Sequence, residues 1–256
     1  MSHSSSALLE AALNGARTSE EHPAIPRTPD EIAAAGHLAV EAGAQVLHIH
    51  AYDPYGHETL AAPYCAAVLT AMRQACPGVS ISLTTSSGVE PDPARRLQLV
   101  GGWIDLPDLV TANMGEPGIA ELCALLLERG IGIEAGLLTL DDARKFIVSG
   151  IAARCTRVLI EPLDESPATA VAHAAEMERV IISAGIDLEQ VHHGDGIASW
   201  AVNRRAVERG YGIRTGLEDT VVLPDGRLAK DNAELVRVAA AILASKTTEI
   251  NPRDQG

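Results

Sequence analysis

Residues 45–84 read QVLHIHAYDPYGHETLAAPYCAAVLTAMRQACPGVSISLT and contain one complete strand–helix–strand unit. Residues 45–50 and 79–84 are short apolar runs of strand length, whereas apolar residues recur at helical spacing over residues 63–75. Parallel strands need a crossover connection of this length, which is usually a helix. This stretch therefore predicts a parallel sheet covered by helices.

The same unit recurs along the chain. The other predicted strands are 8–13, 109–113, 132–135, 157–160, 190–193 and 212–216, and the other predicted helices are 29–42, 93–100, 118–129, 140–149, 167–184, 198–209 and 230–244. Thr28 and Glu31 have the spacing of a capping box at the start of the helix 29–42. Eight strand-then-helix units are the number that closes a TIM (β/α)8 barrel. We therefore predict an α/β TIM barrel, a single domain over residues 1–256 with short flexible N- and C-terminal tails.

An open, doubly wound sheet is the alternative fold, because it also consists of strand–helix units. That fold uses a glycine-rich phosphate loop after its first strand. The residues at this place are Asn14-Gly15-Ala16-Arg17, which do not form such a loop. The pattern therefore favours the barrel.

The composition limits the possible partners and compartment. The formal net charge of -14 argues against nucleic acid and anionic membranes as partners, because both attract basic surfaces. No apolar run reaches the ~18 residues of a membrane span, and the first ten residues lack the basic segment of a signal peptide. The four cysteines include no CxxC pair, which is typical of reduced, buried cysteines. We predict a cytoplasmic protein without a membrane or nucleic-acid partner.

The strongest functional pattern is His48-Ile49-His50. Side chains two residues apart on a strand share a face, so both imidazoles can reach one metal ion. An HxH pair alone could also be two hydrogen-bonded core histidines. A carboxylate from a distant part of the rim strengthens the metal interpretation, and Glu218 supplies one, although alone it could be a solvated loop acid. Two histidines and one carboxylate are typical of a catalytic zinc site with open positions.

Further polar residues gather where the predicted strands end. In a barrel of this kind the carboxyl ends of all strands meet at one rim, and the active site lies there. The predicted rim residues are Asn14, Arg17, Thr84, Thr85, Ser86, Ser87, Thr111, Asn113, Glu116, Glu134, Glu161, His192, His193, Asp195, Arg214, Glu218 and Asp219. This concentration indicates an active site rather than a contribution to stability.

Five short motifs resemble those of the β-keto acid cleavage enzymes. They are ALNGA (12–16), EHPAIP (21–26), HIH (48–50), EAGL (134–137) and RTGLED (214–219), and the resemblance spans nearly the whole chain. It implies a TIM barrel in a homotetramer. It also implies an acyl transfer in which a β-keto acid and acetyl-CoA give acetoacetate and a new acyl-CoA.

The resemblance also implies roles for individual residues. His48, His50 and Glu218 would hold zinc, Asp219 would be the base that deprotonates the carbon between the keto and carboxylate groups, and Arg214 would assist that base. We expect Asp219, Arg214 and Thr84 to be catalytic, Thr84 standing where the family usually has serine. The residues expected to bind substrate are Arg17, Asn14, Ser87, Thr111, Asn113 and Glu134.

Two positions depart from the family pattern. Family members that act on an amino-substituted substrate have carboxylates near its ammonium group, and the matching positions here are Arg17 and Gly136. A cation at this place repels an ammonium group. We therefore expect poor cleavage of 3-keto-5-aminohexanoate and better cleavage of an anionic or uncharged β-keto acid, such as 3-oxoadipate or a short-chain analogue.

Two other functions remain open at this point. A metal-dependent hydrolase or lyase on the same barrel would activate water and would not need acetyl-CoA. A non-catalytic metal- or metabolite-binding barrel would bind zinc without turning over any β-keto acid.

Overall fold

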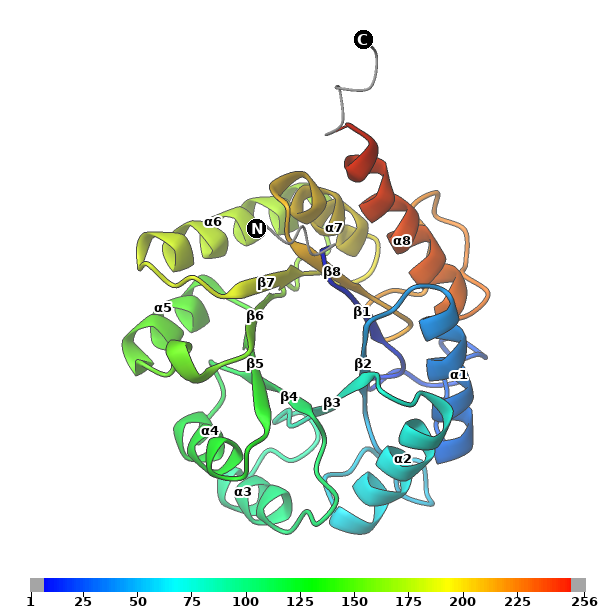
Figure 1. Ribbon diagram of the computed structural model, residues 1–256, viewed down its shortest axis with the longest axis vertical. Coiled ribbons are helices and arrows are strands. Elements are labelled where there is room, and N and C mark those ends of the chain that lie inside the picture. The colour runs from blue at the N-terminus through cyan, green and yellow to red at the C-terminus, as the bar shows by residue number, and fades with distance from the viewer. Residues whose placement is uncertain (1–6, 250–256) are drawn as a thin grey trace.

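The eight predicted strands form a closed parallel barrel in chain order, with β1 hydrogen-bonded to β8 (Figure 1). The computed structural model describes residues 7–249. The strands are β1 (Leu9–Ala12), β2 (Val46–Ile49), β3 (Ser80–Thr84), β4 (Leu109–Asn113), β5 (Gly132–Leu137), β6 (Arg157–Ile160), β7 (Glu189–His192) and β8 (Gly212–Thr215). The predicted TIM barrel is confirmed, and the predicted strand bounds agree with the observed ones to within two residues.

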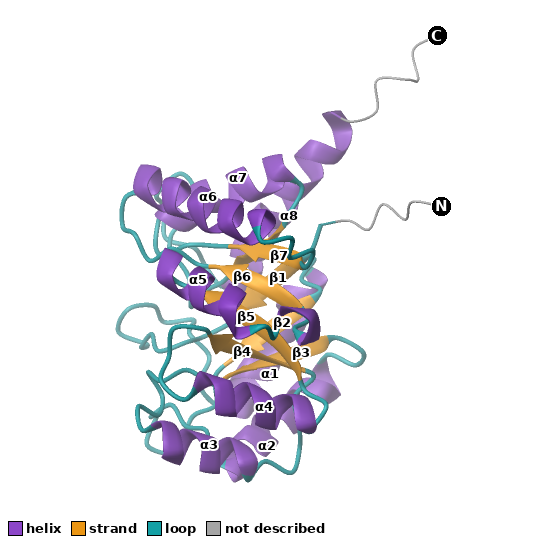
Figure 2. Ribbon diagram, turned by 90° about the vertical axis from the view of Figure 1, so that its left-hand side faces the viewer, coloured by secondary structure: helices purple, strands orange, loops and turns teal. Residues whose placement is uncertain are grey.

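Eight helices surround the barrel (Figure 2). They are α1 (Pro29–Glu41), α2 (Ala62–Ala75), α3 (Pro93–Gly101), α4 (Ile119–Glu128), α5 (Leu140–Ser149), α6 (Pro167–Ser183), α7 (Ala198–Arg209) and α8 (Asn232–Glu249), with a short 3-10 helix at Ala152–Arg154. The predicted capping box of α1 is present, since the Thr28 side chain accepts from the Glu31 backbone N–H and the Glu31 side chain accepts from the Thr28 backbone N–H.

The last helix departs most from its predicted bounds of 230–244. It begins at Asn232, because the Asp231 carboxylate accepts a hydrogen bond from the backbone N–H of Glu234 at 2.8 Å and caps the first turn. It ends at Glu249, beyond the apolar pattern, because a helical backbone does not require apolar side chains. The segments 1–6 and 250–256 of the predicted tails lie outside the described residues.

Alternation along the strands separates an apolar outer face from a polar inner face. Leu47 and Ile49 of β2 are fully buried in the apolar core between the sheet and the helices. On the other face, His48 of β2 lies in register with Ser82 of β3, and Glu134 of β5 with Arg157 of β6. The interior of the barrel is therefore polar well below the rim, where many barrels of this fold have apolar layers.

Within residues 7–249, no helix is both long enough and apolar enough to cross a bilayer.

Candidate metal and active site

His48, His50 and Glu218 lie together at the carboxyl end of the barrel. His48 and His50 project from the end of β2, and Glu218 follows β8. The Nε2 atom of His48 is 3.6 Å from Oε1 of Glu218, and the Nε2 atom of His50 is 3.6 Å from Oε2. Ligand atoms of all three residues lie within 4.8 Å of one another.

This arrangement fits a divalent metal ion. Two ligand atoms about 2.0–2.1 Å from one tetrahedral ion lie about 3.3 Å apart, which is close to the two nitrogen–oxygen distances. Oε2 of Glu218 is buried and has no hydrogen-bond partner. A buried carboxylate oxygen without a hydrogen bond still has a lone pair available for a metal ion, which would offset its desolvation more fully.

The two histidines differ in charge. Burial lowers the pKa of His48 to about 3, so its imidazole is neutral at pH 7. Burial also disfavours the charged form of His50, but the carboxylates of Glu218 and Glu58 outweigh it and raise the pKa of His50 to about 9. Burial alone would raise the pKa of Glu218, yet its cationic neighbours hold that pKa well below its ordinary value.

Each histidine is supported on the ring nitrogen that faces away from Glu218. Nδ1 of His50 pairs with the Glu58 carboxylate. Nδ1 of His48 lies 3.2 Å from Oγ of Ser82 and 3.3 Å from Oγ1 of Thr111. A partner on Nδ1 leaves Nε2 available as a metal ligand, which is the usual arrangement around metal-binding histidines.

The loop that carries Glu218 approaches β1 closely. A Cβ atom on Gly216 would overlap the carbonyl oxygen of Ala12 in β1, so the glycine of RTGLED allows this approach. Gly15 has a φ of +59°, and a Cβ atom there would overlap Cγ of Glu218. The Arg17 Nε atom donates to the Glu218 carbonyl oxygen at 2.9 Å and holds the loop from the other side.

Asp219 lies beside Glu218 and shares a cation with it. Arg214 donates to the Asp219 carboxylate from Nη2 at 2.7 Å and from Nε at 3.2 Å, and Nη2 also donates to Glu218 at 3.0 Å. Burial, with the nearby Glu218 charge, raises the pKa of Asp219 above its ordinary value despite Arg214. His193 lies between Asp219 and Glu161, 3.5 Å from the first carboxylate and 3.4 Å from the second.

Thr84, Ser87 and Asn113 lie on the opposite part of the rim from RTGLED, at the ends of β3 and β4. Glu116 organises part of this group, because its Oε1 accepts from the Ser87 backbone N–H and the Asn113 side-chain amide, both at 3.0 Å. Arg96 donates to the other oxygen of Glu116 at 2.7 Å. The Thr84 hydroxyl accepts from a backbone N–H, and Oδ1 of Asn113 is buried without a partner.

Asn14 was expected to contact substrate, but its side chain is fully buried and bonded to the backbone. Its amide nitrogen donates to the carbonyl oxygens of Pro26 and His50, and its Oδ1 accepts from the N–H groups of Gly15 and His50. These four bonds use the hydrogen-bonding capacity of the amide. Asn14 therefore links β1 to the strand end that presents His50.

Glu134 also lies away from the rim. It is fully buried inside the barrel, where Oε1 accepts from Arg157 at 2.7 Å and Oε2 accepts from the Ser82 hydroxyl. Glu10, Glu134 and His48 form a second group with ligand atoms within 4.8 Å of one another. Glu134 is already paired with Arg157 there, so the group with Glu218 fits a cation better. Burial and the nearby Glu134 raise the pKa of Glu10 well above its ordinary value.

Arg17 lines a pocket of about 360 Å³ that adjoins the metal-ligand group. The lining residues are Gly15, Ala16, Arg17, Glu21, His50 and Glu218. The Arg17 guanidinium group is bonded to two carboxylates of its own chain, Asp195 at 3.0 Å and Glu21 at 3.4 Å. Its positive charge is therefore balanced locally, which weakens the expected attraction for an anionic substrate.

Any residue larger than glycine at position 136 would require the Asn113 side chain to move. A Cβ atom at this position would overlap Oδ1 of Asn113. A carboxylate side chain for a substrate ammonium group therefore has no room at position 136 while Asn113 keeps its place.

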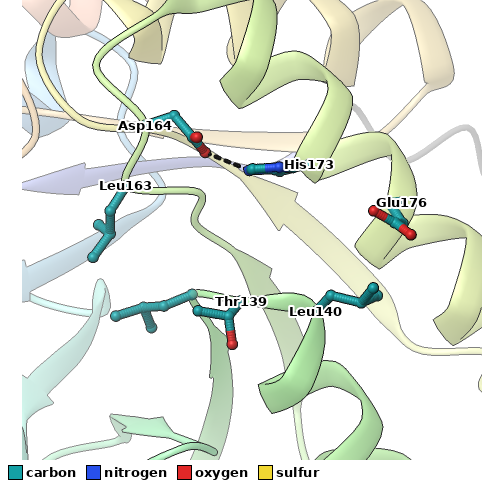
Figure 3. Close-up of a pocket in the computed structure, with 7 residues that line it drawn as sticks. Thr139, Leu140, Leu163, Asp164, His173 and Glu176 are labelled. Atoms are coloured by element: carbon teal, nitrogen blue, oxygen red, sulfur yellow. Dashed lines mark hydrogen bonds and ion pairs between the residues drawn. The ribbon is translucent and has the colours of Figure 1, made fainter.

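A second pocket, of about 500 Å³, contains none of the predicted site residues (Figure 3). It is lined by Leu138, Thr139, Leu140, Leu163, Asp164, His173 and Glu176. On one side of it, Nδ1 of His173 lies 2.8 Å from Oδ2 of Asp164.

Sequence reasoning missed Ser82 and Glu58, the partners of His48 and His50. Ser82 had a usable signal, because Ser80, Ser82 and Thr84 alternate with apolar residues and share a face of β3. Glu58 had none, because it lies in a loop and reaches His50 only through the fold.

Comparison with known proteins places the chain among enzymes that act on keto acids. A family model described as beta-keto acid cleavage enzyme matches residues 6–255. A 3-keto-5-aminohexanoate cleavage enzyme of Fusobacterium nucleatum subsp. nucleatum is 26% identical over 97% of this chain and 95% of its own length. A 3,5-dioxohexanoate:acetyl-CoA acetone transferase of Paraburkholderia graminis is 23% identical over 95% of this chain and 91% of its own length.

Solved structures support the fold. The binary complex of ObcA with oxaloacetate has a TM-score of 0.70 and 17% sequence identity. The match covers 88% of this chain and 64% of that chain, so this chain spans somewhat less than two thirds of its length. At this identity the likeness shows a shared barrel.

The contact between Gly15 and Glu218 gives a test of the metal-ligand geometry. Gly15→Ala is expected to displace the Glu218 side chain and to weaken the binding of a divalent metal ion, with zinc as the probe, about ten-fold or more, in the range found for groups that orient metal ligands. Gly130→Ala is the matched control, because Gly130 also has a positive φ but no atom within 4 Å of the added Cβ. Chelator competition measures both affinities. Equal affinities in the two variants would contradict the arrangement.

The pKa of His50 predicts the proton balance of metal binding. The folded pKa is raised to about 9, so the imidazole is protonated at pH 7 and must lose that proton before Nε2 can coordinate a metal. Zinc binding to the metal-free protein should therefore release about one proton from this residue at pH 7 and progressively less as the pH rises through 9. Calorimetry in buffers of different ionisation enthalpy counts the protons. Binding with no proton release at pH 7 would be the contrary result.

Proposed function

The chain belongs to the beta-keto acid cleavage enzyme family, and on this premise we propose that it is a zinc-dependent acyltransferase that uses acetyl-CoA. A β-keto acid, R–CO–CH2–COO⁻, and acetyl-CoA would give acetoacetate and R–CO–CoA. The observation that carries the proposal is the convergence of His48 and His50 on Glu218, with Asp219 held beside them by Arg214.

His48, His50 and Glu218 would hold the zinc ion through two imidazole nitrogens and one carboxylate. When bound, zinc supplies a Lewis acid that stabilises negative charge on the keto oxygen of the substrate. Three protein ligands leave further coordination positions for the substrate, as catalytic zinc sites require. The neutral imidazole of His48 and the low pKa of Glu218 both favour the ligand forms of these groups.

Asp219 is the proposed base. It would take a proton from the carbon between the keto and carboxylate groups, since its raised pKa makes it a stronger base than an exposed aspartate. Two hydrogen bonds from Arg214 orient its carboxylate. The new carbon–carbon bond would form between this substrate carbon and the acetyl carbon of acetyl-CoA, with release of the CoA thiolate.

The second half of the reaction would reverse these roles. The CoA thiolate would attack the original keto carbon, and the bond between that carbon and the substrate CH2 carbon would break. Asp219 would return its proton to the departing carbon and so complete acetoacetate. His193 lies within 3.5 Å of Asp219, where its ring can support the carboxylate during both transfers.

Thr84, Ser87, Thr111 and Asn113 are the proposed polar contacts for the substrate on the β3 and β4 part of the rim. The buried and unpartnered Oδ1 of Asn113 supports this assignment, because a substrate donor would satisfy it. Thr111 also contacts Nδ1 of His48, so its hydroxyl would support this metal-binding histidine as well as contact the substrate.

We propose that the distal group of the substrate is uncharged or anionic and not an ammonium group. The family members that bind an ammonium group are expected to use carboxylates at positions that here hold Arg17 and Gly136. Because Glu21 and Asp195 balance the Arg17 charge, an uncharged group fits the pocket at least as well as an anionic one.

We further propose a cytoplasmic homotetramer, as the family resemblance implies. Cys65, Cys76, Cys123 and Cys155 are all unpaired and buried, which supports a reducing compartment. Light scattering after size exclusion measures the oligomeric state directly.

The catalytic proposal is tested with a panel of β-keto acids. Acetoacetate should appear only when acetyl-CoA and the metal-loaded enzyme are both present. Asp219→Asn should lower kcat about 10²–10⁴-fold, the usual contribution of a general base, and should keep its zinc. Asp225→Asn, an exposed change on the same loop, should retain wild-type turnover. Cleavage without acetyl-CoA would instead favour a metal-dependent hydrolase or lyase.

The substrate preference is tested through the partner of Arg17. Glu21→Gln removes one negative charge but keeps the Arg17 bond to the Glu218 backbone. It should raise kcat/KM for an anionic β-keto acid relative to an uncharged one by at most about five-fold, as expected for a partly exposed pair. Arg17→Glu should shift the preference the opposite way. Unchanged relative rates in both variants would show that this pocket does not contact the distal group.

A further inference from the structure

A chain of polar side chains runs from His48 through the barrel interior to the opposite rim. Nδ1 of His48 lies 3.2 Å from Oγ of Ser82, and the Ser82 hydroxyl donates to Oε2 of Glu134. Arg157 donates to Oε1 of Glu134 at 2.7 Å and to Glu189 at 2.8 Å. Glu189 begins β7 and is about half exposed at the amino-terminal rim, whereas Glu134 and Ser82 are fully buried.

The direction of these hydrogen bonds follows from the number of protons. A serine hydroxyl has one proton, and Ser82 donates it to Glu134. In the contact with His48 the serine oxygen therefore accepts, and Nδ1 of His48 carries the proton. Oγ1 of Thr111, 3.3 Å from the same Nδ1, can accept this proton as a second acceptor. A neutral imidazole protonated on Nδ1 has its lone pair on Nε2, which is the nitrogen that faces Glu218.

Glu134 is suited to keep Ser82 as its hydrogen-bond donor and therefore as an acceptor from His48. Its second oxygen accepts from Arg157, so the carboxylate cannot turn away from Ser82 without breaking a buried ion pair. A charged acceptor strengthens the Ser82 hydrogen bond, and the low dielectric of the interior strengthens it further. His50 has a different support, because Glu58 contacts its Nδ1 directly at the rim.

We propose that Ser82 and Glu134 are positioning residues that hold His48 in its metal-binding tautomer and so raise the affinity of the site for zinc. The proposal rests on the metal site of the proposed function and assigns Glu134 to the support of a ligand, not to contact with substrate. Arg157 and Glu189 anchor the chain at the far end of the barrel.

Zinc affinity of the purified protein is the first measurement, made by chelator competition without any substrate. Ser82→Ala should weaken binding about 10–100-fold, as removal of such a partner usually does. Ser80→Ala is the matched control, because Ser80 lies two residues earlier on the same face of β3 and is in register with Val46, whereas Ser82 is in register with His48. Ser82→Thr keeps the hydroxyl and should restore most of the affinity.

Nitrogen-15 NMR of the imidazoles is the second measurement, since a merely structural role would not set a tautomer. In metal-free wild type, His48 should be protonated on Nδ1, and Ser82→Ala should increase the Nε2-protonated form. Glu134→Gln should shift the tautomer in the same direction, which also covers the case in which Ser82→Ala does not fold.

These measurements distinguish a failure of the positioning role from a failure of the metal site itself. Equal zinc affinity in wild type and Ser82→Ala, or a wild-type His48 protonated on Nε2, would overturn the positioning role and leave the metal site intact. Absence of zinc binding by the wild-type protein would overturn both.

Discussion

The closure of the barrel between β1 and β8 is the constraint on which the site depends. Leu9, Glu10 and Ala11 of β1 pair with Ile213, Arg214 and Thr215 of β8, and the other edge of β1 pairs with β2. This pairing places RTGLED next to HIH although they are more than 160 positions apart in the sequence. The close approach of Gly216 to Ala12 then brings Glu218 over the ends of β1 and β2.

Around this junction, each buried cationic side chain lies between two carboxylates. Arg214 lies between Glu218 and Asp219, and His50 lies between Glu218 and Glu58. Without these partners, burial would raise the pKa of every carboxylate in the group. Because Glu218 has several cationic neighbours and Asp219 has the Glu218 charge beside it, the pKa values of these adjacent acids move in opposite directions. One fits the role of a ligand and the other that of a base.

The interior of this barrel contains hydrogen-bonded polar side chains in addition to packed apolar ones. Glu134, Arg157 and Ser82 replace part of the apolar filling that usually supports such a barrel. Each buried polar group must be paired to offset its desolvation, and the chain from His48 to Glu189 supplies the partners. Support for the ligands therefore comes from two directions, through the interior for His48 and from the rim for His50.

The amino-acid pattern alone predicted the eight strand–helix units, the shared face of His48 and His50, and the motif that carries Arg214, Glu218 and Asp219. These features depend on local periodicity and on residues close together in the chain, so they can be read without coordinates. The surroundings of Asn14, Arg17 and Glu134 became known only from the folded barrel. Asn14 proved to be saturated by backbone groups, Arg17 to be neutralised by Glu21 and Asp195, and Glu134 to face Arg157 inside the barrel. The physical reason is that a side chain's role depends on which groups from other elements meet it, and those contacts exist only once the barrel has closed.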